Sequence, residues 1–448
     1  MRIEVAEFAR RCGGECLGVP DGCVATSFEL DSRTARSGGL FVAIRGARHD
    51  GHDAVPQAFA AGCVAAVVER PIDGACVVVP DLVEALARMA ATYRDEFAGP
   101  VVGVTGSNGK TTTKEFTAAA LGHLGPVLKN PGNWNTEFTA PLVWAESPGK
   151  AAAVIEMAMR GHGQIGHLAA FSRPTVAVVT NIGTSHIEMV GSREGILEAK
   201  AEIFQGGTGQ HAVLWREDDF YPSLVERTDG PVTTFGASED ADVRATGYRA
   251  LAWDRSAVLL SLHGSSIGVE LPVLGRRNAL NAAAAVAAAT VAGVPFEAAV
   301  QRLARVALPP MRMQAVEHNG AIVLLDTYNA SPDSMVAAIE ALAEMPCSGR
   351  RLAVLGEMRE LGSYSESGHR RVGAALGVFR LDSVLLVGPE AATIGVEAAV
   401  AHPGADIRHV TEVDICRVQD FLDTLQEGDV ALVKGSRALG LERALEGK

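Results

Sequence analysis

The chain has 448 residues, 48% of which are hydrophobic, and its formal net charge is −13. This length predicts more than one domain, and the negative charge argues against nucleic acid as the main partner. No apolar run approaches the roughly 18 residues that a membrane-spanning helix needs. Because the N-terminus also lacks the apolar stretch of a signal peptide, we expect a cytoplasmic protein.

The first 98 residues are predicted to form a small α/β unit. Short apolar runs at 40–44, 65–68 and 76–79 indicate strands, and the Ala-rich stretches between them are typical of helices.

Three of the seven cysteines lie close together near the N-terminus. Cys12, Cys16 and Cys23 come nearest to a metal-binding pattern, but no His or fourth Cys stands at ligand spacing from them. We therefore expect free, buried thiols.

The segment GVTGSNGKTTT, residues 103–113, follows a short apolar run and precedes a helix predicted over 113–124. Strand, glycine loop and helix together form a cradle for nucleotide phosphate, because the glycines let backbone N–H groups turn inward. Lys110 can reach the outer phosphates, and the hydroxyl of Thr111 or Thr112 can bind Mg²⁺. Val104 stands where the common P-loop has glycine, and a structural glycine turn is the alternative interpretation.

Two further apolar runs, at 152–157 and 175–180, are typical of parallel strands that are covered on both faces. Glu156 ends the first run, and His186 follows the second. Ligands gather at the carboxyl ends of parallel strands, so these two side chains are predicted to converge with the P-loop. A carboxylate and an imidazole beside a triphosphate suit Mg²⁺ or Mn²⁺. Taken singly, each could instead be a packed or surface residue.

Lys200 lies on the apolar face of a helix predicted over 192–205, four residues from both Ile196 and Phe204. Burial would lower the pKa of its amine, and an uncharged amine can react with CO₂ to give a carbamate, an anion that can bind Mg²⁺. The alternative is a lysine whose stem is buried while its ammonium reaches water.

A third unit is predicted after a long Ala-rich helix at 278–293 and the linker at Pro309 and Pro310. Strands alternate with helical segments in a doubly wound, Rossmann-like pattern that lacks a dinucleotide GxGxxG motif. The predicted strands are 322–326, 352–355, 383–387, 407–410 and 430–433.

Polar motifs follow several of these strands. Asp326 ends the first, and Ser331 is predicted as a helix N-cap with Pro332 at the first helical position. The loop 327–330 therefore lies where binding sites form. GEMRELG at 356–362 and KGSR at 434–437 also follow strands, and solvated charged loops are the alternative for all three.

Together these motifs resemble the Mur ligases, the ATP-dependent amide ligases of peptidoglycan precursor synthesis, over essentially the whole chain. The resemblance implies an α/β protein of three domains. These are a UDP-substrate-binding domain at 1–98, a central P-loop ATPase-type parallel-sheet domain at 99–308 and a C-terminal Rossmann-like domain at 309–448.

The resemblance also implies roles for residues of this chain. Catalytic roles fall on Lys110, His186 and Lys200. The implied ATP contacts are Gly106, Ser107, Asn108, Gly109, Lys110, Thr111, Thr112, Asn278, Arg312 and Asp326. Two Mg²⁺ would be held by Thr111, Glu156, His186 and a carbamylated Lys200. The implied substrate contacts are Ser32, Arg33, Asn135, Thr136, Tyr328 and Asn329.

DTYNASPDSM, GEMRELG and VKGSR look like the subtype that adds D-Ala-D-Ala, whereas the DNPR of the diaminopimelate-adding subtype is absent. The implied reaction joins D-Ala-D-Ala to UDP-MurNAc-tripeptide through an acyl phosphate, in a monomeric enzyme. A Mur-like ligase for another amine and a catalytically silent nucleotide-binding protein are the alternatives. Departures from the subtype at Thr136, Phe138, Thr139 and Ala158 bear on substrate detail.

Overall fold

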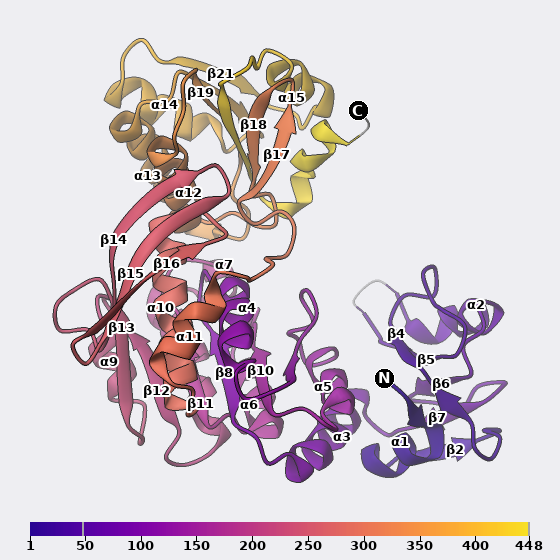
Figure 1. Ribbon diagram of the computed structural model, residues 1–448. Helices are drawn as coiled ribbons and strands as arrows, with labels where there is room; N and C mark the ends of the chain where they lie inside the picture. Colours follow the sequence, from indigo (N-terminus) through magenta and orange to yellow (C-terminus); the bar gives the residue numbers. More distant parts are fainter. Residues whose placement is uncertain (47–48, 447–448) are drawn as a thin grey trace.

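The computed structural model describes residues 1–46 and 49–446 (Figure 1). Within these ranges the chain forms three large sheets and one two-stranded ribbon, with helices packed on the sheets. The predicted α/β class is confirmed, and each large sheet falls inside one of the three predicted units. Among the described residues, no helix combines the length and the apolar character that crossing a membrane requires.

The N-terminal unit is built on a five-stranded sheet of order β2-β7-β6-β5-β4. Its inner strands β5 and β6 are fully buried, as their apolar sequences predict. The elements are β1 Ile3–Glu4, α1 Val5–Cys12, β2 Glu15–Leu17, β3 Val24–Ala25, β4 Ser27–Glu29, β5 Gly39–Val42, α2 Val55–Ala60, β6 Ala65–Val68, β7 Cys76–Val78 and α3 Leu82–Glu96. All seven cysteines are free, but Cys16 is exposed, so the prediction of buried thiols is wrong there.

The central unit has a nine-stranded sheet of order β16-β15-β14-β13-β12-β11-β8-β10-β9. The strands from β9 to β14 run parallel, whereas β15 and β16 continue the sheet as antiparallel strands that the sequence did not predict. These strands are β8 Val101–Thr105, β9 Val127–Lys129, β10 Ala152–Glu156, β11 Val176–Val179, β12 His211–Trp215, β13 Val232–Gly236, β14 Val243–Ala252, β15 Arg255–Leu262 and β16 Ser265–Leu271.

Helices cover both faces of this sheet, and the P-loop helix α4 packs against the Ala-rich α10 (Figure 1). Helix α4 begins at Lys110, three residues earlier than predicted, and the helix that carries Lys200 changes to 3₁₀ geometry after residue 201. The helices are α4 Lys110–Leu121, α5 Ala140–Val143, α6 Gln164–Ser172, α7 Ile187–Val190, α8 Arg193–Ala201, α9 Tyr221–Val225, α10 Arg276–Val291 and α11 Phe296–Leu303.

The third unit has a six-stranded sheet of order β17-β18-β22-β19-β20-β21, in which only β17 is antiparallel to its neighbour. The last strand, β22, is inserted between β18 and β19, so the ends of β18 and β22 lie side by side. The elements are β17 Gln314–His318, β18 Ala321–Leu325, α12 Pro332–Glu344, β19 Arg351–Gly356, α13 Ser365–Phe379, β20 Ser383–Val387, α14 Ala392–Ala401, β21 Asp406–Val410, α15 Ile415–Leu422 and β22 Val430–Lys434.

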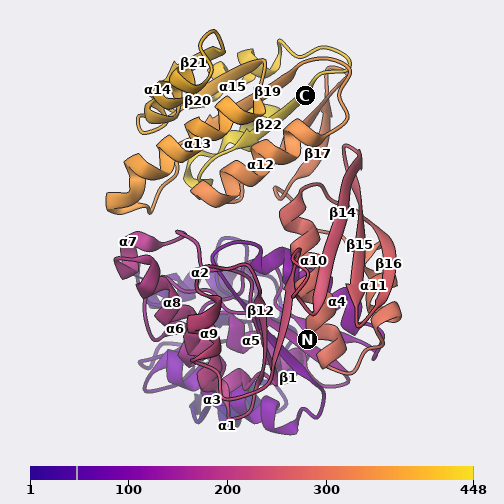
Figure 2. The ribbon, with the colours of Figure 1, turned by 90° about the vertical axis from the view of Figure 1, so that its left-hand side faces the viewer.

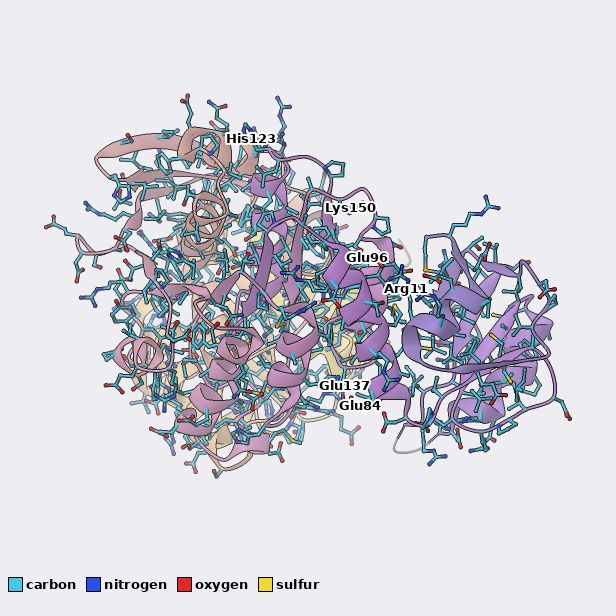
Figure 3. All side chains as sticks on the ribbon, turned by 90° about the horizontal axis from the view of Figure 1, so that it is seen from below. Arg11, Glu84, Glu96, His123, Glu137 and Lys150 are labelled. Atoms are coloured by element: carbon cyan, nitrogen blue, oxygen red, sulfur yellow. The ribbon has the colours of Figure 1, made fainter. Side chains whose placement is uncertain are left out.

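The third unit lies across one end of the central sheet (Figure 2), where α12 contacts α10 and β14. The N-terminal unit stands at the side and is joined to the centre through α3, which contacts α1 as well as α5 and α6. Arg11 and Glu96 mark this junction in Figure 3, and their side chains form an ion pair of 2.9 Å between α1 and α3.

Candidate active site

A cavity of about 1040 Å³ lies between the central and third units. Its walls are the P-loop, the loop around residue 135, the carboxyl ends of β10, β11 and β12, the start of α10, and the first turn of α12. The cavity therefore lies at the carboxyl ends of strands of both sheets, where ligands of open α/β sheets bind.

The P-loop can turn back on itself only because two of its residues lack a side chain. Gly106 and Gly109 both have positive φ, of 144° and 81°. A Cβ atom at Gly106 would overlap the hydroxyl of Thr180, and one at Gly109 would overlap the amide of Asn281. The loop is held further by Asn181, whose Oδ1 accepts a hydrogen bond of 3.1 Å from the backbone N–H of Asn108. This arrangement aims helix α4 at the cavity.

The Lys110 amine lies against its own loop. Its Nζ donates to the carbonyl oxygens of Gly106 at 2.8 Å and of Ser107 at 3.3 Å. Burial lowers the pKa of this amine, the nearby Glu156 carboxylate acts in the opposite direction, and the Arg312 guanidinium lowers it further. A lysine held in this way is available for phosphate oxygens at the mouth of the loop.

Thr111 links three segments that are far apart in sequence. Its hydroxyl donates to Oε2 of Glu156 at 2.9 Å and accepts from Nη2 of Arg312 at 2.8 Å. The other carboxylate oxygen of Glu156, Oε1, accepts from the side-chain amide of Asn135 at 2.8 Å. The predicted convergence of Glu156 with the P-loop is observed, and Arg312 brings the third unit to the same point.

His186 lines the cavity at the N-cap of α7, with φ of 62°. Its Nδ1 lies 2.6 Å from Oε2 of Glu360, which belongs to the GEMRELG motif of the third unit. Burial and the charge of Lys110 lower the pKa of the imidazole, and Glu360 acts in the opposite direction. His186 is thus a second point where the two units meet.

Lys200 lies on α8 with 2% of its surface exposed. Burial, and next the positive charge of Lys110, hold the pKa of its amine well below the ordinary lysine range. The interpretation in which its ammonium reaches water is therefore wrong. The side chain does not line the cavity, and its electrostatic coupling to Lys110 and to His186 ties it to the site.

Known proteins match the chain along its whole length. Residues 25–94 match the catalytic domain of the Mur ligase family, residues 104–289 match the Mur ligase middle domain, and residues 311–437 match the Mur ligase glutamate ligase domain. The UDP-N-acetylmuramoyl-tripeptide–D-alanyl-D-alanine ligase of Synechocystis sp. is 38% identical over 98% of this chain and 95% of that protein.

The chain belongs to the Mur ligase family. Its structure agrees with that of MurF from Acinetobacter baumannii, with a TM-score of 0.87 and 32% identity over 99% of this chain and 98% of that one. It also agrees with MurF ligase from Thermotoga maritima in complex with ADP, with a TM-score of 0.80 and 34% identity over 94% and 96% of the two chains. The predicted family and fold are confirmed.

Most of the residues that were predicted to act line the cavity of this Mur ligase. They are Ser107, Asn108, Gly109, Lys110, Thr111, Thr112, Asn135, Thr136, Glu156, His186, Asn278, Arg312, Asp326, Tyr328 and Asn329. Ser32 and Arg33 do not line it, because they belong to the N-terminal unit. There, Ser32 donates to Oε1 of Gln57 at 2.8 Å, and the exposed Arg33 pairs with Asp31 at 2.6 Å.

The third unit of this Mur ligase contributes an ordered wall. Ser331 is the N-cap of α12, as predicted, and its hydroxyl donates to Oδ1 of Asn108 in the P-loop at 2.9 Å. The Arg312 guanidinium lies 4.0 Å from the centre of the Tyr328 ring. The P-loop is therefore contacted by two separate segments of the third unit.

Lys114 was missed by the sequence analysis. It is fully buried on α4, and its amine donates to the carbonyl oxygen of Asn130 at 2.8 Å while lying 3.2 Å from Glu115 and 3.8 Å from Glu156. Asn130 in turn hydrogen-bonds the backbone N–H and carbonyl of Glu156 at 2.8 and 3.0 Å. Nothing in the periodicity of the segment distinguishes Lys114 from a surface lysine.

The end of the cavity beside α10 contains a further pair that was missed. The Arg277 guanidinium lies 4.7 Å from the Trp215 ring, and both line the cavity together with Asn278 and Asn281. The side-chain amide of Asn278 donates to the carbonyl oxygen of Leu274 at 2.7 Å. Trp215 is the last residue of β12, so the strand-end rule that found Glu156 could have found it.

The departures from the subtype lie on one wall. Thr136 and Thr139 share a hydrogen bond of 3.0 Å between their hydroxyl groups, and the backbone N–H of Ala158 donates to the carbonyl oxygen of Asn135 at 3.1 Å. Thr136, Phe138 and Ala158 line the cavity. The substituted residues thus form part of an ordered loop beside Glu156.

Proposed function

We propose that this Mur ligase uses ATP to join D-Ala-D-Ala to UDP-MurNAc-tripeptide in peptidoglycan precursor synthesis. Full-length similarity to ligases that carry this name supports the substrates, and the ADP complex of the Thermotoga maritima relative supports the nucleotide. The observation that carries the proposal is the hydrogen bond from Arg312 to Thr111, because it joins the third unit to the P-loop, where nucleotide phosphates bind.

We assign the nucleotide phosphates to the loop Gly106–Thr112 and to Arg312. Asn278 is assigned to the purine end of the same cavity. Asp326 is assigned to the ATP end of the cavity, where its Oδ1 accepts from the backbone N–H of Met313 beside Arg312 at 3.2 Å. Ser32, Arg33, Asn135 and Thr136 are assigned to the UDP-peptide, and Tyr328 and Asn329 to the dipeptide acceptor.

Mg²⁺ fits the residues at the P-loop. The hydroxyl of Thr111 and the carboxylate of Glu156 are hard oxygen donors already 2.9 Å apart. No group of three His, Cys, Asp or Glu side chains in the part of the chain that the structure describes could hold a metal by itself, which suits an ion completed by phosphate oxygens. When bound, Mg²⁺ would neutralise charge on the transferring phosphoryl group and the carboxylate.

In the proposed reaction, the carboxylate oxygen of the tripeptide attacks the terminal phosphorus of ATP, and ADP leaves. The amine of D-Ala-D-Ala then attacks the carbonyl carbon of the acyl phosphate, loses a proton and expels phosphate. Lys110, Arg312 and the P-loop N–H groups would stabilise the charge that develops on the phosphoryl oxygens. Closure of the third unit over the cavity would exclude the water that hydrolyses an acyl phosphate.

We further propose that Lys200 is carbamylated in the active enzyme. Its buried amine has no hydrogen-bond partner among the described residues, and a depressed pKa favours the neutral form that attacks the carbon of CO₂ and then loses a proton. With His186, the resulting anion would hold a second Mg²⁺. Because two of the three substrates, ATP and the UDP-linked tripeptide, are nucleotides, we place the enzyme in the cytoplasm, and we propose that it acts as a monomer.

A phosphate-release assay tests the proposed function. The protein is incubated with ATP, Mg²⁺ and UDP-MurNAc-tripeptide, and D-Ala-D-Ala is compared with D-Ala, L-Lys, L-Glu and diaminopimelate. Phosphate release with D-Ala-D-Ala alone, and a product whose mass is the sum of both substrates minus water, is the expected result. Equal release with a single amino acid would point to another acceptor, and no release at all would point to a silent nucleotide-binding protein.

A further inference from the structure

Arg312 is presented by an unusual turn. The residues on both sides of it, Met311 and Met313, have positive φ angles of 59° and 50°. Residues other than glycine, asparagine or aspartate rarely adopt this left-handed backbone conformation, and they keep it only where their surroundings hold them. Two of them flanking one arginine indicate that neighbouring groups fix the direction of its side chain.

The structure contains these holding groups. The backbone N–H of Met313 donates to Oδ1 of Asp326 at 3.2 Å, and the backbone N–H of Met311 donates to the side chain of Gln314 at 2.9 Å. The carbonyl oxygen of Met311 accepts from the backbone N–H of Tyr328 at 3.3 Å. Asp326 therefore holds the turn directly on the C-terminal side of Arg312.

Asp326 is itself held by Lys434. The Lys434 amine donates to Oδ2 of Asp326 at 2.6 Å, to the carbonyl oxygen of Asp326 at 3.3 Å and to that of Asn329 at 2.8 Å. The side chain is 2% exposed. An ammonium has three donors, so all of its hydrogen-bonding capacity is used within the protein. The position follows from the strand order, because β22 ends at Lys434 directly beside the end of β18.

We propose that Lys434 is a positioning residue: through Asp326 it fixes the strained turn that aims Arg312 at the P-loop. The inference rests on the proposed role of Arg312 at the nucleotide phosphates. The strand-end motif KGSR, for which a solvated loop was the alternative interpretation, would then help the third unit to bind nucleotide phosphate. Lys434 lines the cavity, but its amine donates to Asp326 and Asn329, so it acts on the nucleotide through Arg312.

A double-mutant cycle on the full-length protein tests this inference. The affinity for a fluorescent, non-hydrolysable ATP analogue is measured for the wild type, Lys434→Met, Arg312→Ala and the double variant. We expect Arg312→Ala to weaken binding by about tenfold or more, since it removes a charged hydrogen bond. Lys434→Met should weaken binding by about threefold to tenfold in the wild-type background and by less than about twofold in the Arg312→Ala background. Additive losses, or no loss in Lys434→Met, would overturn the inference.

A matched control separates positioning from loss of stability. Arg350 pairs with the buried Asp429 at 2.6 Å, at the opposite end of the same strand β22. Arg350→Met also leaves a buried carboxylate without its partner, so it should lower the midpoint of thermal unfolding. It should leave the affinity for the ATP analogue unchanged. An equal loss of affinity in Arg350→Met would assign the effect of Lys434 to general destabilisation.

Asp326→Ala serves as the second variant if Lys434→Met does not fold, because it leaves the Lys434 amine two carbonyl acceptors. A loss of affinity that disappears in the Arg312→Ala background supports positioning. A loss that persists there would make Asp326 a direct nucleotide ligand and would overturn the linkage. The binding assay contains no acceptor, so a failure to ligate D-Ala-D-Ala would count against the proposed function and leave this test intact.

Discussion

The two buried lysines nearest the phosphate position have opposite surroundings. The Lys110 amine is held by two carbonyl oxygens of its own loop, whereas no hydrogen bond of the Lys200 amine is present among the described residues. The first arrangement gives the ammonium two acceptors, although burial still lowers its pKa. The second makes a charged amine unfavourable and favours its chemical modification.

We predict that Lys110→Ala lowers kcat/KM for ligation by about a thousandfold or more, because a preorganised charge at the phosphoryl group is lost. The midpoint of thermal unfolding should stay close to the wild-type value, since the amine contacts only loop carbonyls. Lys150→Ala, a lysine outside the cavity, is the control and should retain full activity. Normal folding with near wild-type phosphate release would falsify the role of Lys110.

Lys200→Met is predicted to stabilise the fold in CO₂-free buffer without Mg²⁺ or nucleotide. At pH values between the lowered folded-state pKa and 10.5, folding removes the proton of this amine, and that removal costs free energy. The gain in the free energy of unfolding should therefore grow as the pH falls from 10.5 towards neutrality, and it should vanish as the pH approaches 10.5, where the unfolded chain also loses the proton. Chemical denaturation across this pH range measures it, and a loss of stability at pH 7 would contradict the burial argument.

Lys200→Ala should lose most ligation activity, and the loss tests the proposed carbamate. A short carboxylic acid such as acetate or formate, added to Lys200→Ala, is expected to restore part of the activity by occupying the vacated anion position. Lys150→Ala should show no response to the acid. Full activity of Lys200→Ala without any acid would reduce Lys200 to a packed residue.

At the scale of elements, the first turn of helix α12 both caps the helix and contacts the P-loop. Ser331 caps the helix, since its backbone N–H donates to the Ser334 hydroxyl oxygen at 2.9 Å, and its own hydroxyl donates to Oδ1 of Asn108. We predict that Ser331→Ala costs about 1 kcal/mol of stability and also raises the KM for ATP. Asp414→Ala removes the N-cap of α15 in the same unit, so it should cost similar stability without changing that KM. Equal KM effects in both variants would show that α12 acts only through the stability of its unit.

Local sequence patterns predicted where strands and helices end, but they did not predict which strands pair. Glu156 and Asp326 were placed at strand ends because an apolar run stops at each, and Ser331 was placed as a cap because proline follows it. The insertion of β22 beside β18 depends on pairing between distant segments, as does the contact of Lys434 with a residue 108 positions away. The antiparallel strands β15 and β16 were missed because their buried and exposed residues alternate and give no continuous apolar run, although His263 and Gly264, both with positive φ, form a turn between them. Strand-end residues and the buried Lys200 were therefore within reach of the sequence, whereas the buried contacts of Lys114 and Lys434 were not.

At the scale of the molecule, the cavity is closed by the central and third units, while the N-terminal unit stands apart beyond α3 (Figure 1). A substrate that carries a nucleotide at one end and a peptide at the other suits this separation. The nucleotide end would lie on the N-terminal unit, and the peptide end would reach the loop that contains Asn135. The two ends should then respond independently to substitution.

We predict that Arg33→Ala raises the KM for UDP-MurNAc-tripeptide by about tenfold, because a charged hydrogen bond to the nucleotide is lost. The KM for ATP should stay unchanged, since Arg33 does not line the cavity that holds the P-loop. Stability should change by less than about 0.5 kcal/mol, because Arg33 is exposed and pairs only with its neighbour Asp31. Arg10→Ala, which removes an exposed arginine paired with Glu7 in the same unit, is the matched control and should leave both KM values at the wild-type level. If Arg33→Ala instead changes the KM for ATP, or changes neither KM, the UDP-precursor does not bind this face of the N-terminal unit.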